Sequence, residues 1–293
     1  MKPIITIGVC VKDSAPTLNQ AIDSILYQDF PHELIEVIFV DDGSKDSTLS
    51  IIKSYIPRLD MVTKVFHHEW KGLGFSRNVV INNTGGKYIV WLDGDMILQS
   101  NNLRALYEFM EKNPNAGIAK AKYGLRNNDK TISYLENIGY VAVDSIFGGS
   151  CTERPLGTGG AIYRFDAVKM VGGFDSYLKG VGEDMDIEYR IRKVGWSLFL
   201  GAPAIFYEQR RSSMQALWRE AYWHGKGGHD VFTKDKSQFA LYKMTPIAGF
   251  FAGVWYSIIA YKLTRRKLVF LLPLHYTLKR IAWCIGFFKG KGK

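Results

Sequence analysis

Two clusters of carboxylates follow apolar runs in the first hundred residues. Asp42 lies in the segment VDDGS, which ends one run, and Asp93 and Asp95 lie in WLDGD, which ends another. Each cluster stands just past the end of an expected β-strand, and in open α/β sheets ligands bind in the crevice at the carboxyl ends of the strands. One cluster can hold the ribose and base of a nucleotide, and the other a metal ion on its phosphates. The pattern predicts an enzyme that uses a nucleotide-activated substrate.

A third group of carboxylates, Glu183, Asp184 and Asp186, stands at the start of an expected helix. A carboxylate that takes the proton from an attacking hydroxyl speeds a transfer reaction by about 10²–10⁴-fold. The helix dipole also favours acidic side chains in the first turn, so a structural role for Glu183 and Asp186 stays open. The run GTGG at 157–160 fits either a loop beside such a site or a simple turn.

Apolar periodicity places these clusters on alternating strands and helices. For the first hundred residues this order predicts a parallel sheet with helices on both faces. The expected strands cover residues 4–11, 35–40, 61–67 and 88–92, and the expected helices between them cover 17–27, 47–55 and 74–82. Further on, we expect helices over 98–110, 166–171 and 183–194, with shorter strands and loops over 116–165.

The composition is that of a globular protein. Of the 293 residues, 47% are hydrophobic and 23% charged, enough for one large domain with an appendage. The cysteines Cys10, Cys151 and Cys284 lie far apart and form no CxxC pair, which indicates neither a zinc site nor a disulfide framework. The first residues run directly into an expected strand without signal-peptide features, so we expect a cytosolic start.

The net charge of +10 is concentrated at the C-terminal end. From Val231 onward the chain has 12 Lys and Arg residues and one acid, Asp235, whereas the first 230 residues have 26 basic and 27 acidic residues. These basic residues alternate with long apolar runs, which favours an anionic membrane surface over nucleic acid as the partner.

The apolar runs of this tail approach the length of a membrane span. Residues 244–261 carry no charge over 18 positions and as a helix would be about 27 Å long. A second stretch, 268–278, is interrupted by Pro273 and followed by a short run over 281–288. If the first stretch crossed from a cytosolic domain, the basic connector after it would lie outside, against the positive-inside rule. We therefore expect helices that lie in the interface or re-enter on the cytosolic side. A complete span, or a helical pair folded onto the protein's own core, is the alternative.

Five motifs in order resemble the inverting glycosyltransferases of family 2. They are VDDGS, GFSRN ending at Asn78, LDGD, GTGG at 157–160, and GEDMDIEYRIRKVGW at 182–196. The resemblance covers roughly residues 4–224 and is to membrane-associated members such as the dolichol- and polyprenol-pathway sugar transferases. It implies an α/β protein of GT-A fold, with a Rossmann-like nucleotide half over about 1–96 and an acceptor half over 97–230. A basic, apolar, membrane-associating helical tail over 231–293 would follow.

The resemblance assigns residues to the nucleotide side. Asp42 is expected to bind the base or ribose, while Asp41 helps to hold the turn; a merely capped turn is the alternative for both. Asp93 and Asp95 resemble the family's DxD motif and are expected to hold Mg²⁺ or Mn²⁺, with Asp93 shared between metal and ribose. Gly94 would permit a close approach of the backbone.

Other residues are assigned to the reaction itself. Asp184, the second residue of the Glu-Asp pair, is the expected general base, and Glu183 is the alternative. Gly159, Gly160 and Glu183 are expected on the acceptor and diphosphate side. Arg77 either reaches the nucleotide or its diphosphate, or is an ordinary surface arginine.

The chain departs from the family's pattern at two places and resembles it at a third. Lys12-Asp13 stands where many relatives have an aromatic residue and Asn, which puts base stacking in doubt. Glu208 stands near the place of a metal-binding His and is a candidate third ligand; water is the alternative. The segment REAYWHGKG resembles a loop that closes over the diphosphate, where His224 and Lys226 would contact phosphates or be only structural.

The predicted function is inverting transfer of a sugar from a UDP- or GDP-linked donor to a lipid-linked or membrane-proximal glycan acceptor. The catalytic domain is expected on the cytoplasmic face of the membrane. A polyprenyl-phosphate sugar synthase is the alternative within this family. A nucleotidyltransferase and an inactive, membrane-bound sugar-nucleotide sensor are further alternatives; the intact Asp42, Asp93, Asp95 and Asp184 argue against the sensor.

Overall fold

The computed structural model describes residues 2–126, 129–178, 181–238 and 240–290. These residues form two compact units. The first unit takes residues 2–122, 148–178 and 183–208. The second takes residues 123–126, 129–147, 181–182, 209–238 and 240–290.

The first unit is built on a mixed sheet, which contains nine strands among the described residues. The strands are β1 (Ile5–Val11), β2 (Ile35–Asp42), β3 (Val62–His68), β4 (Tyr88–Trp91), β5 (Met96–Leu98), β6 (Ala116–Tyr123), β7 (Ser150–Cys151), β8 (Ala161–Arg164) and β9 (Ser197–Glu208). Their order is β3-β2-β1-β4-β8-β6-β9-β5, with β7 paired to β9. Strands β1 to β4 are parallel to one another, whereas β8 is antiparallel to both β4 and β6.

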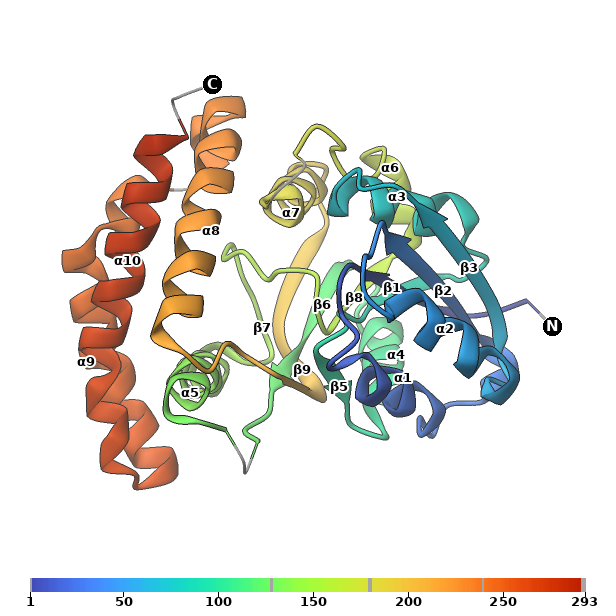
Figure 1. The fold of residues 1–293 in the computed structure, drawn as a ribbon, viewed down its shortest axis with the longest axis horizontal. Helices are drawn as coiled ribbons and strands as arrows, with labels where there is room; N and C mark the ends of the chain where they lie inside the picture. Colours follow the sequence, from blue (N-terminus) through green and yellow to red (C-terminus); the bar gives the residue numbers. More distant parts are fainter. Residues whose placement is uncertain (1, 127–128, 179–180, 239, 291–293) are drawn as a thin grey trace. The chain divides into compact units, whose positions relative to one another are not determined.

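Helices cover both faces of this sheet. They are α1 (Leu18–Leu26), α2 (Thr48–Tyr55), α3 (Leu73–Asn83), α4 (Asn102–Lys112), α6 (Phe165–Met170) and α7 (Glu183–Lys193), with short 3₁₀ turns η1 (His32–Leu34) and η2 (Ile56–Arg58). Figure 1 shows α3 and α6 on one side of the sheet and α1, α2 and α4 on the other. The parallel sheet and its helices confirm the prediction for the first hundred residues, with small differences in the boundaries.

The parallel order explains why the acidic motifs meet. Every residue of β1 and β2 is buried, because both strands are mostly apolar and are covered on two faces. The carboxyl ends of parallel neighbours lie at the same edge of a sheet. Asp42 ends β2, and Asp93 follows β4 by two residues, so both stand at that edge.

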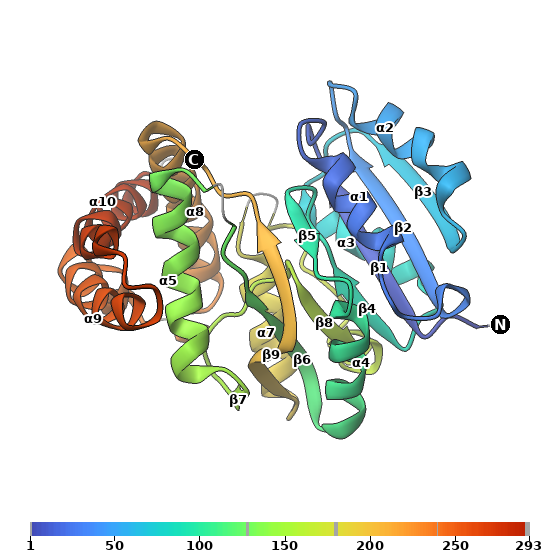
Figure 2. The same ribbon diagram turned by 90° about the horizontal axis from the view of Figure 1, so that it is seen from below.

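The second unit is helical. It contains α5 (Thr131–Phe147), α8 (Met214–Lys234), α9 (Pro246–Thr264) and α10 (Leu272–Lys289), with 3₁₀ turns η3 (Lys236–Gln238), η4 (Leu241–Met244) and η5 (Lys267–Leu271). Figures 1 and 2 show α9 and α10 side by side, joined by the short η5. Their core with α5 contains the buried side chains of Tyr134, Leu135, Ile138, Ala142, Ala260, Val269 and Leu272.

Helix α5 corrects the prediction for residues 116–165. That range was expected to hold only short strands and loops, but 17 of its residues form one helix. Its β-branched residues and Gly139 mimic a strand and a turn. The buried positions Tyr134, Leu135, Ile138 and Ala142 nevertheless recur at helical spacing, and they are covered by the C-terminal helices.

The C-terminal helices also differ from the prediction. Pro273 does not interrupt an apolar run; it lies in the first turn of α10, where its missing N–H group is not needed. The segments Pro246–Thr264 and Lys267–Lys289 are long and apolar enough to cross a membrane by length and composition. Only 22% and 28% of their apolar windows are buried, so much of both segments is exposed.

Candidate functional site

Asp42 fixes the loop that precedes α3. Its side chain is only 5% exposed and accepts hydrogen bonds from the backbone N–H groups of Lys71 (2.8 Å) and Gly72 (3.0 Å). The adjacent Gly43 has a φ of +75°, and a Cβ there would stand 2.7 Å from the backbone N of Trp70. This turn therefore requires glycine. Direct contact of Asp42 with a base or ribose stays a prediction.

Asp41 holds the turn itself, as expected from the sequence. Its buried carboxylate accepts a hydrogen bond from the backbone N of Ser44 at 3.1 Å. It also lies 2.8 Å from Nδ1 of His67 on the neighbouring β3. Asp41 thus has its partners within the protein.

Arg77 is not a surface residue. On α3 it is only 3% exposed, and its guanidinium pairs with the carboxylate of Glu183 at the start of α7. The same guanidinium lies 3.9 Å from Asp93. Burial of Arg77 therefore excludes the surface alternative, and places its positive charge beside the DGD motif.

The electrostatics of this pair are unusual. Burial would lower the pKa of Arg77, but Glu183, Asp93 and Asp184 together raise it. Burial raises the pKa of Glu183 from 4.5 to about 7, although Arg77 opposes the shift. Glu183 thus gains and loses its proton near neutral pH, while Arg77 stays charged.

The glycine loop approaches the DGD motif closely. A Cβ at Gly159 would stand 2.6 Å from Oδ2 of Asp93, and a Cβ at Gly94 would stand 2.9 Å from Cβ of Ser14. Gly160 has a φ of +71°, and a Cβ there would stand 2.6 Å from the ring of Phe206. A side chain at Gly159 would push the loop away from Asp93, so this glycine permits a close approach as well as a turn.

Lys120 is a member of this site that the sequence analysis did not identify. It lies on β6, is 2% exposed, and donates hydrogen bonds to the carbonyls of Gly157 (3.3 Å) and Gly159. A Cβ at Gly157 would stand 3.6 Å from Oδ2 of Asp184 and 3.9 Å from Nζ of Lys120. The ammonium group therefore holds the glycine loop next to the expected base.

Glu188 lies on the same helix as the expected base Asp184, four residues later in the chain. It is buried and accepts a hydrogen bond from the backbone N of Leu156 at 2.8 Å. Burial, together with the negative charge of Asp184, raises the pKa of Glu188 from 4.5 to about 8. Its carboxyl group is therefore mostly protonated at pH 7.

A divalent cation fits the donor set at the DGD motif. The Asp93 side chain keeps 36% of its surface exposed. Among the residues that the structure describes, no three His, Cys, Asp or Glu side chains gather as a ligand group. Mg²⁺ and similar ions are commonly held by one or two carboxylates plus substrate phosphates, which matches this arrangement. Glu208, which pairs with Met96 in the sheet, stays a predicted third ligand.

His224 and Lys226 belong to the second unit. They are exposed on α8, so the segment predicted as a loop is helical here. Its glycines suggested a loop, but Gly225 and Gly228 instead pack against Trp283 of α10. Contact of His224 or Lys226 with phosphate stays a prediction.

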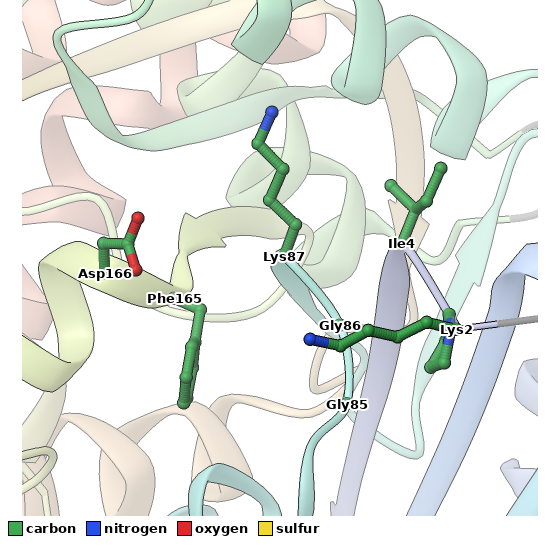
Figure 3. A pocket seen from close by; sticks show the side chains of 8 residues that line it. Lys2, Ile4, Gly85, Gly86, Lys87, Phe165 and Asp166 are labelled. Atoms are coloured by element: carbon green, nitrogen blue, oxygen red, sulfur yellow. The ribbon is translucent and has the colours of Figure 1, made fainter.

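The first unit also has an open pocket of about 410 Å³. It lies where β1 and β4 begin, at the sheet edge opposite the acidic motifs, and Figure 3 shows Ile4, Lys87 and Asp166 around it. The amine of Lys87 is already paired with Glu111 at 2.6 Å. Among the residues described, its lining contains none that the sequence assigned to the site.

A family model described as Glycosyl transferase family 2 matches residues 6–171. This range is more than half of the chain. It includes Asp42, Arg77, Asp93 and Asp95, and it ends before α7 begins.

Among curated proteins, the chain is similar to poly-beta-1,6-N-acetyl-D-glucosamine synthases. It is 23% identical over 235 residues to the synthase of Staphylococcus epidermidis, covering 77% of this chain and 54% of that protein. It is 22% identical over 240 residues to the synthase of Staphylococcus aureus, covering 79% of this chain and 56% of that protein. The chain thus spans about half the length of these relatives.

Two solved structures share the fold. The mannosyltransferase PcManGT from Pyrobaculum calidifontis, in complex with GDP-Man and Mn²⁺, has a TM-score of 0.68 at 16% identity and covers 99% of this chain and 87% of its own. S. aureus TarS 1–349, in complex with UDP-GlcNAc, has a TM-score of 0.54 at 17% identity and covers 98% and 91%. The likeness confirms the GT-A fold that the motifs predicted.

Proposed function

The chain belongs to glycosyl transferase family 2, and we propose that it transfers a sugar with inversion from a nucleoside-diphosphate sugar to a membrane-proximal acceptor. The acceptor is a lipid-linked glycan or another glycan at the membrane. The names of the relatives support this class of acceptor, since the curated relatives are synthases of a polysaccharide.

One observation carries the proposal. Asp93, Asp184 and the buried cations Arg77 and Lys120 come together around the glycine loop. The cations suit a leaving diphosphate, and Asp184 suits an incoming hydroxyl. A reaction that leaves a nucleoside diphosphate and consumes an alcohol needs both kinds of group.

The chain's own residues suggest how the reaction proceeds. Asp184 takes the proton from the acceptor hydroxyl as its oxygen attacks the anomeric carbon, and the diphosphate leaves from the opposite face. Arg77 exchanges part of its pairing with Glu183 for the diphosphate oxygens, and Glu183 takes up a proton as it loses this partner. Direct attack of the acceptor oxygen, with Asp184 as the base and without a nucleophilic carboxylate of the protein, inverts the anomeric centre.

A divalent cation, Mg²⁺ or Mn²⁺, held by Asp93 and Asp95 would supply Lewis-acid stabilisation of the leaving diphosphate. Glu208 is the candidate for a further oxygen ligand. The nucleoside of the donor is uridine or guanosine. One solved neighbour binds UDP-GlcNAc and another binds GDP-Man.

The second unit supports a membrane location. Its helices expose many large apolar side chains in a tail that carries an excess of Lys and Arg. Such a surface suits an anionic bilayer, and the cytoplasmic leaflet is the anionic one. We therefore place the catalytic unit on the cytoplasmic face.

The test begins with calorimetry on the full chain. UDP- and GDP-sugars are titrated with Mn²⁺, with Mg²⁺ and with EDTA, and one donor is expected to bind only when metal is present. Asp95→Ala should abolish this metal-dependent binding of the donor. No binding of any donor, or equal affinity with EDTA, would contradict the proposed donor site.

Activity then separates the acceptor classes. With a membrane acceptor fraction, Asp184→Asn should reduce turnover by about 10²–10⁴-fold while the donor still binds. A variant that keeps its activity would favour a polyprenyl-phosphate acceptor, which needs little help from a base. Release of pyrophosphate in place of a nucleoside diphosphate would overturn the reaction class.

A further inference from the structure

We propose that the second unit lies in the plane of an anionic bilayer, with lipid contacting one face of α9 and η5, and that neither candidate span crosses the membrane. This inference rests on the membrane location proposed above. It commits to a geometry, whereas length and composition alone allow both segments to cross.

The outer face of α9 is a continuous apolar surface. Exposed side chains recur along it at helical spacing, and Phe251 and Trp255 are 65% and 59% exposed. The face comprises Ile247, Phe250, Phe251, Val254, Trp255 and Ile258. Phe270 and Leu271 of η5 are also exposed. A soluble monomer rarely exposes so much apolar surface without a partner.

The inner face of α9 is already occupied. A Cβ at Gly249 would stand 3.1 Å from the carbonyl O of Tyr276, and one at Gly253 would stand 2.5 Å from Cα of Pro273. The two helices therefore pack backbone against backbone through these glycines. Only the outer face of α9 remains for lipid.

One face of α10 is covered by α8, a helix that carries several charged residues. A Cβ at Gly225 of α8 would stand 2.9 Å from the backbone N of Phe287 in α10. A Cβ at Gly286 of α10 would stand 2.9 Å from the carbonyl C of Tyr222 in α8. Phe232 of α8 adds an edge-on ring contact with Phe287 at 5.7 Å between centroids. Helix α10 cannot cross a bilayer in this arrangement unless α8 crosses with it.

Helix α8 is unsuited to that environment. Its sequence contains Arg219, Glu220, Lys226, Asp230 and Lys234, and all but Glu220 are exposed. Charged side chains on a lipid-facing helix are strongly disfavoured at the bilayer centre. Helix α8 therefore keeps α10 outside the hydrocarbon core.

A buried ion cluster also ties α10 to α5. Lys279 of α10 lies 2.7 Å from Oε2 of Glu136 of α5, and His275 pairs with the same carboxylate. Glu136 and His275 are both buried. If α10 moved into lipid without α5, the charges of Lys279 and Glu136 would be separated in a medium that solvates neither. The cluster thus keeps the four helices as one body at the surface.

Basic residues border the apolar face. Lys262, Arg265, Arg266 and Lys267 are exposed where α9 turns into η5. In an in-plane helix these cations lie at the level of the headgroups, where they attract anionic lipid. In a spanning hairpin the same residues would have to be carried across the membrane. The charge pattern therefore fits an anionic surface.

The first experiment measures binding of the full chain to sealed vesicles of phosphatidylcholine, with and without phosphatidylglycerol. Trp255→Gln removes a side chain from the proposed face; Trp223→Gln is the matched control, since Trp223 is 50% exposed on α8 of the same unit. We expect anionic lipid to strengthen binding, and Trp255→Gln to weaken it about tenfold while Trp223→Gln has little effect. Equal effects of the two variants, or a change of oligomeric state in place of lipid binding, would overturn the proposed face.

The second experiment tests the geometry. Arg265→Cys and Lys289→Cys place thiols at the two ends of the α9–α10 pair, and an impermeant maleimide is applied to spheroplasts and to inverted membrane vesicles of an expressing cell. Mass spectrometry identifies the labelled site, so the natural cysteines do not interfere. In-plane attachment requires both sites to be labelled from the same side. Labelling from opposite sides would overturn it.

The outcomes keep the two proposals distinct. A chain found entirely in the soluble fraction that binds no vesicles would contradict the membrane location itself. A membrane-bound chain with its two thiols on opposite sides would contradict only the in-plane geometry. Donor binding and transfer are measured independently of either result.

Discussion

At the scale of single residues, the two members of the buried pair Arg77–Glu183 differ in how much stability the protein loses when each is removed. Arg77 has a second carboxylate, Asp93, at 3.9 Å, whereas removal of Arg77 would leave Glu183 buried without a cation. At pH 8 the carboxyl group of Glu183 must then either stay charged without a cation or take up a proton that the unfolded chain does not hold. A broken buried pair of this kind destabilises a protein by about 3–5 kcal/mol. Loss of the arginine should therefore be worse than loss of the glutamate.

We predict that Arg77→Met at pH 8 lowers the free energy of unfolding by about 3–5 kcal/mol, and that Glu183→Gln lowers it by much less. The double variant should be more stable than Arg77→Met alone, because no buried charge is left unpaired. Urea unfolding of the four proteins forms a double-mutant cycle. Additive effects would show that the two side chains do not act as a pair.

Glu188 makes stability depend on pH. Its pKa is raised from 4.5 to about 8, so below pH 4.5 the group is protonated in both the folded and the unfolded chain. As the pH rises toward 8, only the unfolded chain loses the proton, and the folded state loses about 1.4 kcal/mol per pH unit relative to it.

We therefore predict that Glu188→Gln flattens the decline of the unfolding free energy between about pH 5 and 8. Urea midpoints measured across that range check this. Asp166→Asn, on the first turn of α6, is a control in the same unit. A wild-type curve with the same slope as the Glu188→Gln curve would refute the neutral state of Glu188.

Lys120 should affect turnover more than donor affinity. It holds the carbonyls of Gly157 and Gly159 beside Asp184, so Lys120→Met should displace the loop and remove a nearby positive charge. We expect kcat to fall at least about tenfold, with the acidic limb of the rate–pH profile moved to higher pH. Lys122→Met is the matched control, since Lys122 lies on the same strand and is exposed. A change in Km alone would contradict the positioning role.

The residues of the candidate site were predictable to different degrees. Asp42, Asp93 and Asp184 were found because an acid at a strand end or a helix start stands out from its apolar neighbours. Lys120 was missed because Lys120 and Lys122 alternate with apolar residues, as solvent-facing residues of a strand do. Only the glycine loop, 37 to 39 residues later in the chain, buries one of them.

At the scale of elements, the sequence predicted correctly those helices and strands whose structure depends on residues nearby in the chain. The strands and helices of the first hundred residues have continuous apolar runs or clear helical spacing, and their positions were confirmed. Helix α5 was missed because its helical state depends on partners about 120 residues away. The glycines of α8 suggested a loop because their packing role is visible only against α10.

Glycine contacts also predict how the C-terminal helices respond to substitution. A Cβ at Gly253 would stand 2.5 Å from Cα of Pro273, a backbone atom that cannot rotate away. We predict that Gly253→Val separates α9 from α10 and lowers the unfolding free energy by about 1–3 kcal/mol. Ala252→Val, at the adjacent, partly exposed position, is the control. Hydrogen exchange should show faster exchange of α9 and α10 in the glycine variant; unchanged exchange would contradict the close packing.

At the scale of the whole molecule, the two compact units are interleaved along the chain. Residues 129–147 belong with the C-terminal helices, although the sequence on both sides of them builds the sheet of the first unit. The boundaries predicted from the sequence, at about residues 96 and 230, remain predictions. The composition of the chain does not change at the ends of such an insertion, so the sequence alone does not reveal it.

The interleaving has a consequence for synthesis on the ribosome. Helix α5 ends at Phe147, but its partner α10 begins only at Leu272. At typical elongation rates of about 5–20 residues per second, the apolar face of α5 emerges about 6–25 seconds before that partner exists. During this interval the nascent chain presents an uncovered helix, and a ribosome stalled before codon 260 would release a product prone to aggregate. The last helix to be made is thus the one that completes folding.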